Sequence, residues 1–402
     1  MVGYFRNFIK TIFAIFRSKY KWLAILFLIW LYRIDFMPDT GGGMAKVVQV
    51  VSLLGMFYFI HKYKHDVVSN TFAKTNMAVK SAFILYLYAL MSTIWAYMPM
   101  MAGFLSFQNL ILIMLMVWFF DNFKTFRSME KGFVLFSLSA VSFEWLCARV
   151  NSPGLVTHFL GGASSAALCF AYCSGEWMKC KRSDRERAKF LKYSMLLAFF
   201  LMITCTSMGA NAAAIVGFAV GCLFSGNVIW AFLLFFAGGT LYLNQDLIEE
   251  LILVIAPDKN MDTIKTGNGR DTIWEALLEM AHQKPIFGWG FACIERTCPD
   301  AISGQQLSDA HSNFVGMYGS LGIVGVVLFV FHLLASLLKT FSSRMKSGYL
   351  GLFAALVTAL INSYSYGFLS GKGCSITVVY FALVVLTFYY GKVSLTYGRK
   401  GK

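Results

Sequence analysis

The sequence predicts an all-α polytopic membrane protein with about 12 transmembrane helices and a long extracytoplasmic loop between spans 9 and 10. Of its 402 residues, 58% are hydrophobic and only 14% are charged, whereas a soluble protein of this length carries about a quarter charged residues. The mean hydropathy is +0.63, and the apolar residues form runs about as long as a bilayer is thick. A soluble protein with a large core is therefore excluded.

The net charge of +15 does not indicate a nucleic-acid partner. Lys and Arg form short clusters between the apolar runs, which is how basic residues set the orientation of a membrane protein.

The first apolar run is followed by Arg33 and Asp35 rather than by a cleavage site of small residues, so no cleavable signal peptide is predicted. The nine cysteines lie mostly inside apolar runs, and metal-ligand spacing is absent from the sequence. We therefore expect no nucleic acid, no metal and no cofactor.

A spanning helix needs about 20 mostly apolar residues. Residues 194–243 are almost continuously apolar and could hold two long spans or three short ones. The turn signals Met208-Gly209-Ala210-Asn211 and Ser225-Gly226-Asn227 favour three. The predicted spans then lie near residues 22–37, 44–61, 80–97, 101–120, 131–148, 154–174, 190–207, 209–225, 227–243, 313–338, 348–366 and 373–391.

The distribution of charge supports the count with three spans in that region. With a cytoplasmic N-terminus, this count places most of the 35 basic residues on the cytoplasmic side. With two spans, the basic clusters near residues 339–346 and 392–402 would face outward, against the rule. We therefore divide the chain into residues 1–243 with nine spans, the extracytoplasmic loop 244–312, and residues 313–402 with three spans and a cytoplasmic tail. The loop has five basic and eleven acidic residues, as an outside loop can.

The basic segment 175–192 is interpreted as a cytoplasmic loop that fixes topology and touches anionic lipid, rather than as a ligand-binding patch. Several ionisable residues lie instead at the outer ends of predicted spans. Each is explained by snorkelling to the interface, and together they suggest a cationic vestibule at the outer leaflet. They are Arg33, Asp35, Lys46, Glu144, Arg149 and His158.

The loop contains one predicted amphipathic helix, over residues 271–283, which we expect to lie along the membrane surface. Pro285 stops it. Its apolar face consists of Ile273, Trp274, Leu277, Leu278 and Ala281.

Arg270 stands at the first turn of this helix, where a cation opposes the helix dipole. Anion binding is one explanation, because free backbone N–H groups and a guanidinium would converge there. A salt bridge to Asp271 or Glu275 is the other. His311 directly precedes the tenth span, where Ser312 or Asn313 caps the helix. It is structural, a general base or a donor to a phosphate oxygen.

Two further features of the loop have open interpretations. Gly288-Trp289-Gly290 forms a flexible turn that could let backbone approach a ligand. Cys293 and Cys298 share the loop, and a disulfide between them is one of two alternatives if the loop is extracytoplasmic.

Three motifs follow one another in this part of the chain: Gly269-Arg270-x-x-x-Trp274, Pro285-Ile286-x-Gly288-x-Gly290 and Ala310-His311-Ser312-Asn313. Their order resembles the O-antigen ligase and polysaccharide polymerase superfamily. The resemblance implies an enzyme of the bacterial cytoplasmic (inner) membrane that transfers a glycan from an undecaprenyl-pyrophosphate carrier to a glycan or a lipid A core, without metal or nucleotide sugar. It implies that Arg270 contacts the pyrophosphate and that His311 activates the acceptor hydroxyl.

The sequence departs from the family pattern at one position. The family often shows Thr-x-Ser-Arg-Gly at an outer helix turn, where the arginine is a second pyrophosphate contact. Here Met208 takes the place of that arginine, after Ser207. Arg149, Arg33 or Lys46 could supply the missing charge, since all three are predicted on the same side.

Two other classes of function are weighed against glycan transfer. A transporter or flippase of lipid-linked sugars usually has its largest loop inside, at mid-chain, and charges within its spans, and this sequence shows neither. A non-enzymatic assembly partner is the third interpretation. Within the superfamily, the sequence leaves ligase and polymerase open.

Overall fold

The computed structural model describes residues 20–36, 43–151, 160–205, 207–234, 270–298, 310–371 and 373–398. All regular elements in these ranges are helices, which confirms the all-α class. They are α2 (Lys21–Phe36), α3 (Gly43–Tyr63), α4 (Val67–Ala73), α5 (Met77–Met91), the 3-10 helix η1 (Ser92–Ile94), α6 (Pro99–Asp121), α7 (Phe126–Asn151), α8 (Leu160–Cys180), α9 (Arg185–Thr204), α10 (Met208–Phe224), α14 (Arg270–His282), α15 (Ile294–Thr297), α16 (Asn313–Ser342), α17 (Tyr349–Ser365) and α18 (Ser375–Gly398).

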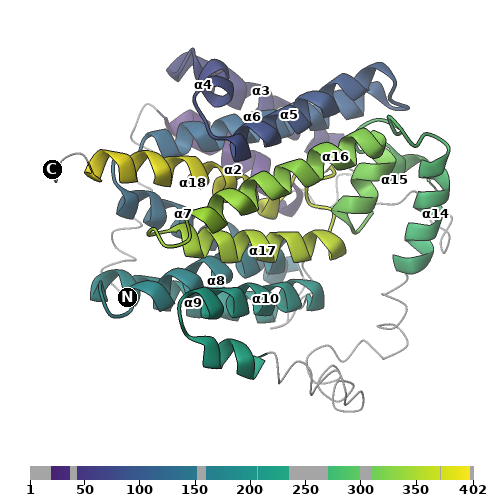
Figure 1. The fold of residues 1–402 in the computed structure, drawn as a ribbon. Coiled ribbons are helices and arrows are strands. Elements are labelled where there is room, and N and C mark those ends of the chain that lie inside the picture. Colours follow the sequence, from purple (N-terminus) through teal and green to yellow (C-terminus); the bar gives the residue numbers. More distant parts are fainter. Residues whose placement is uncertain are drawn as a thin grey trace.

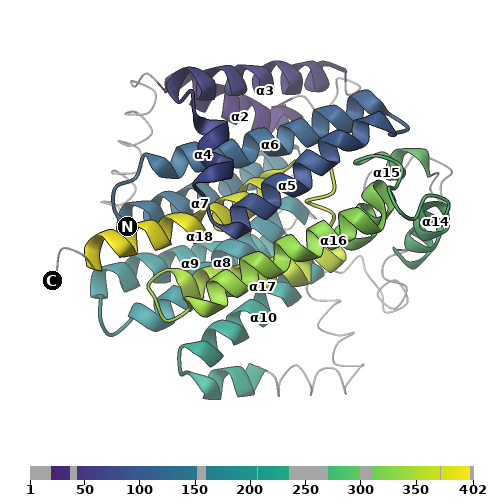
Figure 2. The same cartoon turned by 45° about the horizontal axis from the view of Figure 1, so that its top comes forward.

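The long helices form one bundle, with α2 and α3 on one side and α9 and α10 on the other (Figures 1 and 2). α8 lies inside it and packs against α7, α9, α10, α17 and α18. Small residues fill the first turns of α8, over residues 161–167, and all are buried. Small residues let helix backbones approach closely where both partners are in lipid, so this composition explains the central place of α8.

Most predicted spans coincide with a helix, although some bounds shift. The sixth was expected at 154–174 and is α8, which ends at Cys180; the seventh was expected at 190–207 and is α9, which begins at Arg185. The ninth, 227–243, is described only to residue 234 and is helical from residue 228. Among the described residues, six helices are long and apolar enough to cross a membrane, judged by length and composition. The count of about 12 crossings remains a prediction, as do the bounds of the loop.

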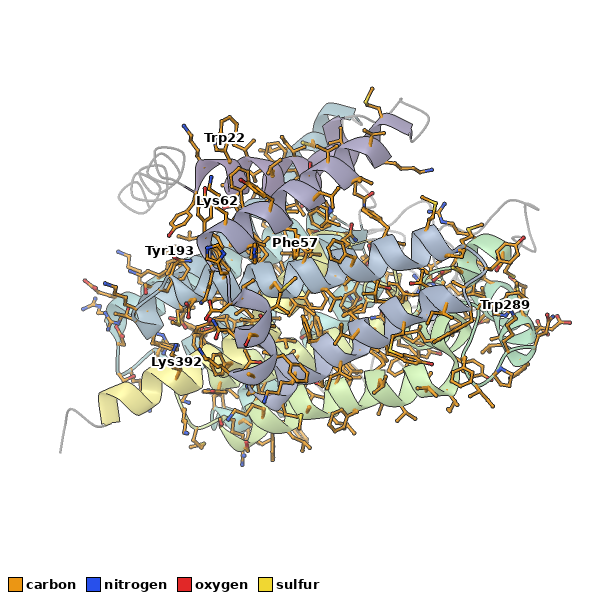
Figure 3. All side chains as sticks on the ribbon, turned by 90° about the horizontal axis from the view of Figure 1, so that it is seen from above. Trp22, Phe57, Lys62, Tyr193, Trp289 and Lys392 are labelled. Atoms are coloured by element: carbon orange, nitrogen blue, oxygen red, sulfur yellow. The ribbon has the colours of Figure 1, made fainter. Side chains whose placement is uncertain are left out.

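Basic residues gather at one end of the bundle, which we call the basic end. Lys64 pairs with Asp121, and Lys179 Nζ donates to the carbonyl oxygen of Arg344 at 2.9 Å. Figure 3 shows Lys62 and Lys392 at this end and Trp289 at the opposite one. α14 and α15 lie at that opposite end, which we call the loop end (Figure 1).

One arginine of the 175–192 segment is buried, which the interpretation as a cytoplasmic loop did not anticipate. The segment is mostly helical, because α8 runs to Cys180 and α9 starts at Arg185. Arg187 Nε donates to Glu130 at 2.7 Å, and its guanidinium also pairs with Glu176. Glu176 accepts the backbone N–H of Gly348 at 2.8 Å, so this cluster joins α7, α8, α9 and the start of α17. The exposed Lys181, Arg182 and Arg185 still fit the expected role in topology.

α16 is broken at Gly322, which has φ 64° and ψ −164°. The backbone groups that the break leaves without helical partners are satisfied by residues 285–290. Ile323 N donates to Pro285 O at 2.8 Å, while Trp289 N and Gly290 N donate to the carbonyls of Gly319 and Ser320 at 3.0 and 2.9 Å. A backbone group in lipid has no water to bond, so this short segment completes the broken helix.

Candidate functional site

The predicted loop helix is present as α14, shifted by one residue from the expected 271–283. Leu277 and Ala281 are buried on the predicted apolar face and pack with Ile294 of α15 and Val315 of α16. The side chains predicted to lie off this face are exposed: Asp271, Glu275, Glu279 and His282. The periodicity of the sequence therefore predicted this face correctly, and α16 is what covers it.

Arg270 and His311 lie on two segments that a hydrogen bond joins. Trp274 Nε1, on α14, donates to the carbonyl oxygen of Ala310 at 2.9 Å, and Ala310 directly precedes His311. Arg270 stands one helical turn before Trp274, about 6 Å along the axis. Both residues are half-buried at the loop end, so the structure brings the two principal predicted residues to the same region.

His311 has a left-handed backbone with φ 51°. A side chain other than glycine is uncommon there, and surrounding contacts must hold it. On one side is the Trp274 bond to Ala310. On the other, Ser312 caps α16 by accepting the N–H of Val315 at 3.5 Å. This confirms one of the two predicted caps. Contacts on both sides therefore fix the backbone position from which the imidazole of His311 projects.

Asn313, which the sequence indicated as a possible cap of the helix, also anchors the start of α16. Its Nδ2 donates to Ser363 Oγ of α17 at 2.9 Å, and its Oδ1 accepts the N–H of Leu369 at 2.7 Å. The side chain is fully buried. It ties the start of α16, two residues after His311, to α17 and to the connection before α18. Its place in the Ala-His-Ser-Asn motif was the available signal.

Met208 opens α10 at the loop end. Ser207 caps this helix by accepting the N–H of Ala210 at 3.4 Å. Gly209 packs so closely on Ser365 of α17 that a Cβ would overlap its hydroxyl. The neighbouring Tyr364 meets the ring of Trp274 edge-on, with centroids 5.2 Å apart. The place of the missing arginine therefore adjoins the elements that carry Arg270 and His311.

Of the other predicted cationic residues, the structure describes only the side chain of Lys46. Lys46 is exposed in the first turn of α3, which packs against α2 and α6 on another side of the bundle (Figure 2). Arg33 lies near the end of α2 and Arg149 near the end of α7. Their side chains, and all of His158, fall outside what the structure describes.

Gly288 and Gly290 serve the contact with α16 rather than a turn open to a ligand. Their φ values are 69° and 99°. A Cβ at Gly288 would overlap the backbone of Ser320, and one at Gly290 would overlap Ala96. Between them, Trp289 Nε1 donates to the carbonyl oxygen of Met280 at 3.0 Å and so holds the end of α14.

Cys293 and Cys298 flank α15 and are not joined by a disulfide. Burial raises the pKa of the Cys293 thiol, which lowers its reactivity. No group of three or more His, Cys, Asp or Glu side chains within the described ranges could hold a metal ion.

Residues 190–330 match a family model described as O-Antigen ligase. The matched range includes Met208, Arg270 and His311, and the match confirms the resemblance drawn from the motifs. It supports, at the family level, a membrane enzyme that transfers glycans as a ligase or a polymerase. A comparison with curated proteins found no match to the chain.

Proposed function

We propose that this chain transfers a glycan from an undecaprenyl-pyrophosphate carrier to an acceptor sugar at the outer surface of the bacterial cytoplasmic membrane. The acceptor is a growing glycan, if the enzyme is a polymerase, or a lipid A core, if it is a ligase. The observation that carries the proposal is the bond from Trp274 to Ala310, because it joins the helix of Arg270 to the segment of His311.

In this proposal Arg270 stabilises the leaving group. The bond between the anomeric carbon and the pyrophosphate breaks, and negative charge grows on the departing oxygen. A guanidinium offers two parallel N–H donors to such an anion. The first turn of α14 adds the positive end of the helix dipole, which also favours an anion. Stabilising charge that develops in the transition state is usually the largest single contribution to catalysis.

His311 is the proposed general base. Its imidazole takes the proton of the acceptor hydroxyl as the oxygen attacks the anomeric carbon, and general base catalysis of this kind contributes about 10²–10⁴-fold. A single displacement of the pyrophosphate would invert the configuration at that carbon.

A second contact to the pyrophosphate would complete the proposed site. With Met208 in place of the family arginine, we keep Arg149, Arg33 and Lys46 as candidates to supply the charge. Each is tested by substitution with Ala, and normal glycan transfer by all three variants would remove this part of the proposal.

Two substitutions with matched controls test the catalytic assignment. We expect Arg270→Ala and His311→Ala each to lower transfer by at least about 100-fold, the scale of a lost general base or charge donor. Arg296→Ala, a half-buried arginine of α15, and His282→Ala, at the exposed end of α14, should transfer glycan normally. Normal transfer by both Arg270→Ala and His311→Ala in correctly inserted protein would refute the assignment.

Deletion of the gene separates the remaining alternatives through the glycans that accumulate. Lipid-linked single repeat units would identify a polymerase, and full-length unattached chains would identify a ligase. Unchanged glycans together with altered movement of a lipid-linked sugar would instead support the flippase interpretation.

A further inference from the structure

Two large apolar side chains of the polar loop face outward. Ile286 and Phe287 are 55% and 54% exposed. They belong to the predicted loop, and residues 282–284, which precede Pro285, are polar or charged. Exposed contiguous apolar groups on a protein surface mark a site of contact. The question is what covers them.

The backbone that carries these side chains is fixed, so they cannot turn inward. Pro285 and Ile286 accept the N–H groups of Ile323 and Val324, at 2.8 and 3.4 Å, across the break in α16. Phe287 O accepts Trp95 Nε1 at 2.9 Å. Exposure is therefore the consequence of a docked backbone.

Two stripes of exposed apolar residues lead up to this point along neighbouring helices. The stripe on α16 begins just after the break and repeats every three or four residues: Ile323, Val327, Phe331, Leu334 and Leu338. The stripe on α5 continues into η1: Ile84, Leu87, Met91 and Ile94. Such stripes on spanning helices face lipid. They reach Phe287 through Trp95, which follows Ile94 and whose ring lies 5.6 Å from that of Phe287.

The residues around the apolar pair are those found where hydrocarbon meets headgroups. Trp95, Tyr97 and Trp289 are amphipathic rings of the interfacial kind. Lys284 Nζ lies 4.1 Å from the ring of Trp289, with an exposed side chain that can reach headgroup phosphates.

We propose that residues 284–287 are a membrane insertion element, in which Ile286 and Phe287 enter the acyl chains of the adjacent leaflet. The occupant is bilayer lipid, because the pair continues two lipid-facing stripes and is rimmed by interfacial residues. Trp289 links the element to Met280, so insertion holds the end of α14 at the membrane surface. The proposal concerns lipid contact and does not depend on glycan transfer.

The test measures the depth of single labelled positions in nanodiscs. Phe287→Cys, Ile286→Cys and Ile94→Cys are each labelled with an environment-sensitive maleimide fluorophore. The nanodiscs contain phosphatidylcholine and phosphatidylglycerol, with or without lipid that carries a nitroxide at carbon 5 of an acyl chain. Insertion predicts that the nitroxide lowers the fluorescence of each position by about twofold or more, as for a group buried several ångströms into the acyl boundary.

Matched positions define the two limits. Val327→Cys, on the α16 stripe, gives the value for a lipid-facing residue, and His282→Cys, exposed on α14, gives the value for a water-facing one. The unsubstituted protein corrects for its native cysteines. Three exposed positions of the same patch are read separately, so a folding defect in one does not end the test. The proposal would be overturned if the nitroxide quenched labels at 286 and 287 no more than the label at 282 and if aqueous iodide quenched them instead.

Discussion

His311 shows how neighbouring residues fix the backbone of a single residue. Its left-handed backbone lies between Ala310, held by Trp274, and Ser312, which caps α16. The residue type and its place before a span were visible in the sequence. The partner of Ala310 was not, because 36 residues separate it from Trp274 and only the packing of α14 on α16 brings them together.

Trp274→Phe tests this positioning role directly. The substitution keeps a ring against Tyr364 but removes the N–H that Ala310 accepts. A net hydrogen bond contributes about 1 kcal/mol, so we expect turnover to fall about fivefold while the KM for the donor changes little. Trp22→Phe, at an exposed ring of α2, is the control. Equal turnover in the two variants would show that the bond does not position His311.

Arg187 tests the buried cluster at the basic end. Removing one partner of a buried ion pair costs about 3–5 kcal/mol, because charge is left without compensation. We therefore expect Arg187→Ala to lower the free energy of unfolding in mixed SDS micelles by about that amount. Arg185→Ala, exposed two residues earlier, should stay within about 0.5 kcal/mol of the unsubstituted protein. Similar losses in both would contradict a structural role for the cluster.

At the scale of elements, periodic segments were predictable and broken ones were not. α14 follows the apolar spacing of its sequence to within one residue. By contrast, residues 313–338 look like one uninterrupted span, and the backbone groups around the break at Gly322 bond to partners 30 to 38 residues earlier in the chain. The glycines of the Pro-Ile-x-Gly-x-Gly segment were visible as permissive positions. The sequence has no local signature for what they contact, which is α16 at Gly288 and Ala96 at Gly290.

Gly322→Ala tests whether the break in α16 is needed for the stability of the protein. A Cβ there would overlap the carbonyl oxygen of Ile286, and the φ of 64° strains any L side chain. We expect the residue 285–290 contact to be lost, with a large fall in the yield of monodisperse protein and in its thermal stability in detergent. Gly103→Ala in α6, where a Cβ makes an ordinary 3.4 Å contact with Thr93, is the matched control. Unchanged stability of Gly322→Ala would mean that α16 can pass this point as a continuous helix.

At the scale of the whole molecule, the all-α class follows from composition, and the described spans follow from hydropathy. The placement of charge in the sequence predicted that one end of the bundle would be basic. Lys62 and Lys392 both lie at that end (Figure 3). The number of crossings is less accessible, since 17-residue helices such as α10 and α17 are near the lower limit of a span. Helix length alone therefore leaves the count undecided.

The orientation of the bundle decides whether the proposed chemistry can occur, because a lipid-linked glycan presented outside needs Arg270 and His311 outside. Excess Lys and Arg mark the cytoplasmic side, so we expect the basic end inside. His282→Cys, exposed at the loop end, should react with an impermeant maleimide in intact spheroplasts, and Lys346→Cys, exposed at the basic end, only after permeabilisation. The reverse pattern would place the loop in the cytoplasm, where the proposed acceptor hydroxyl could not reach His311, and glycan transfer by this site would have to be abandoned.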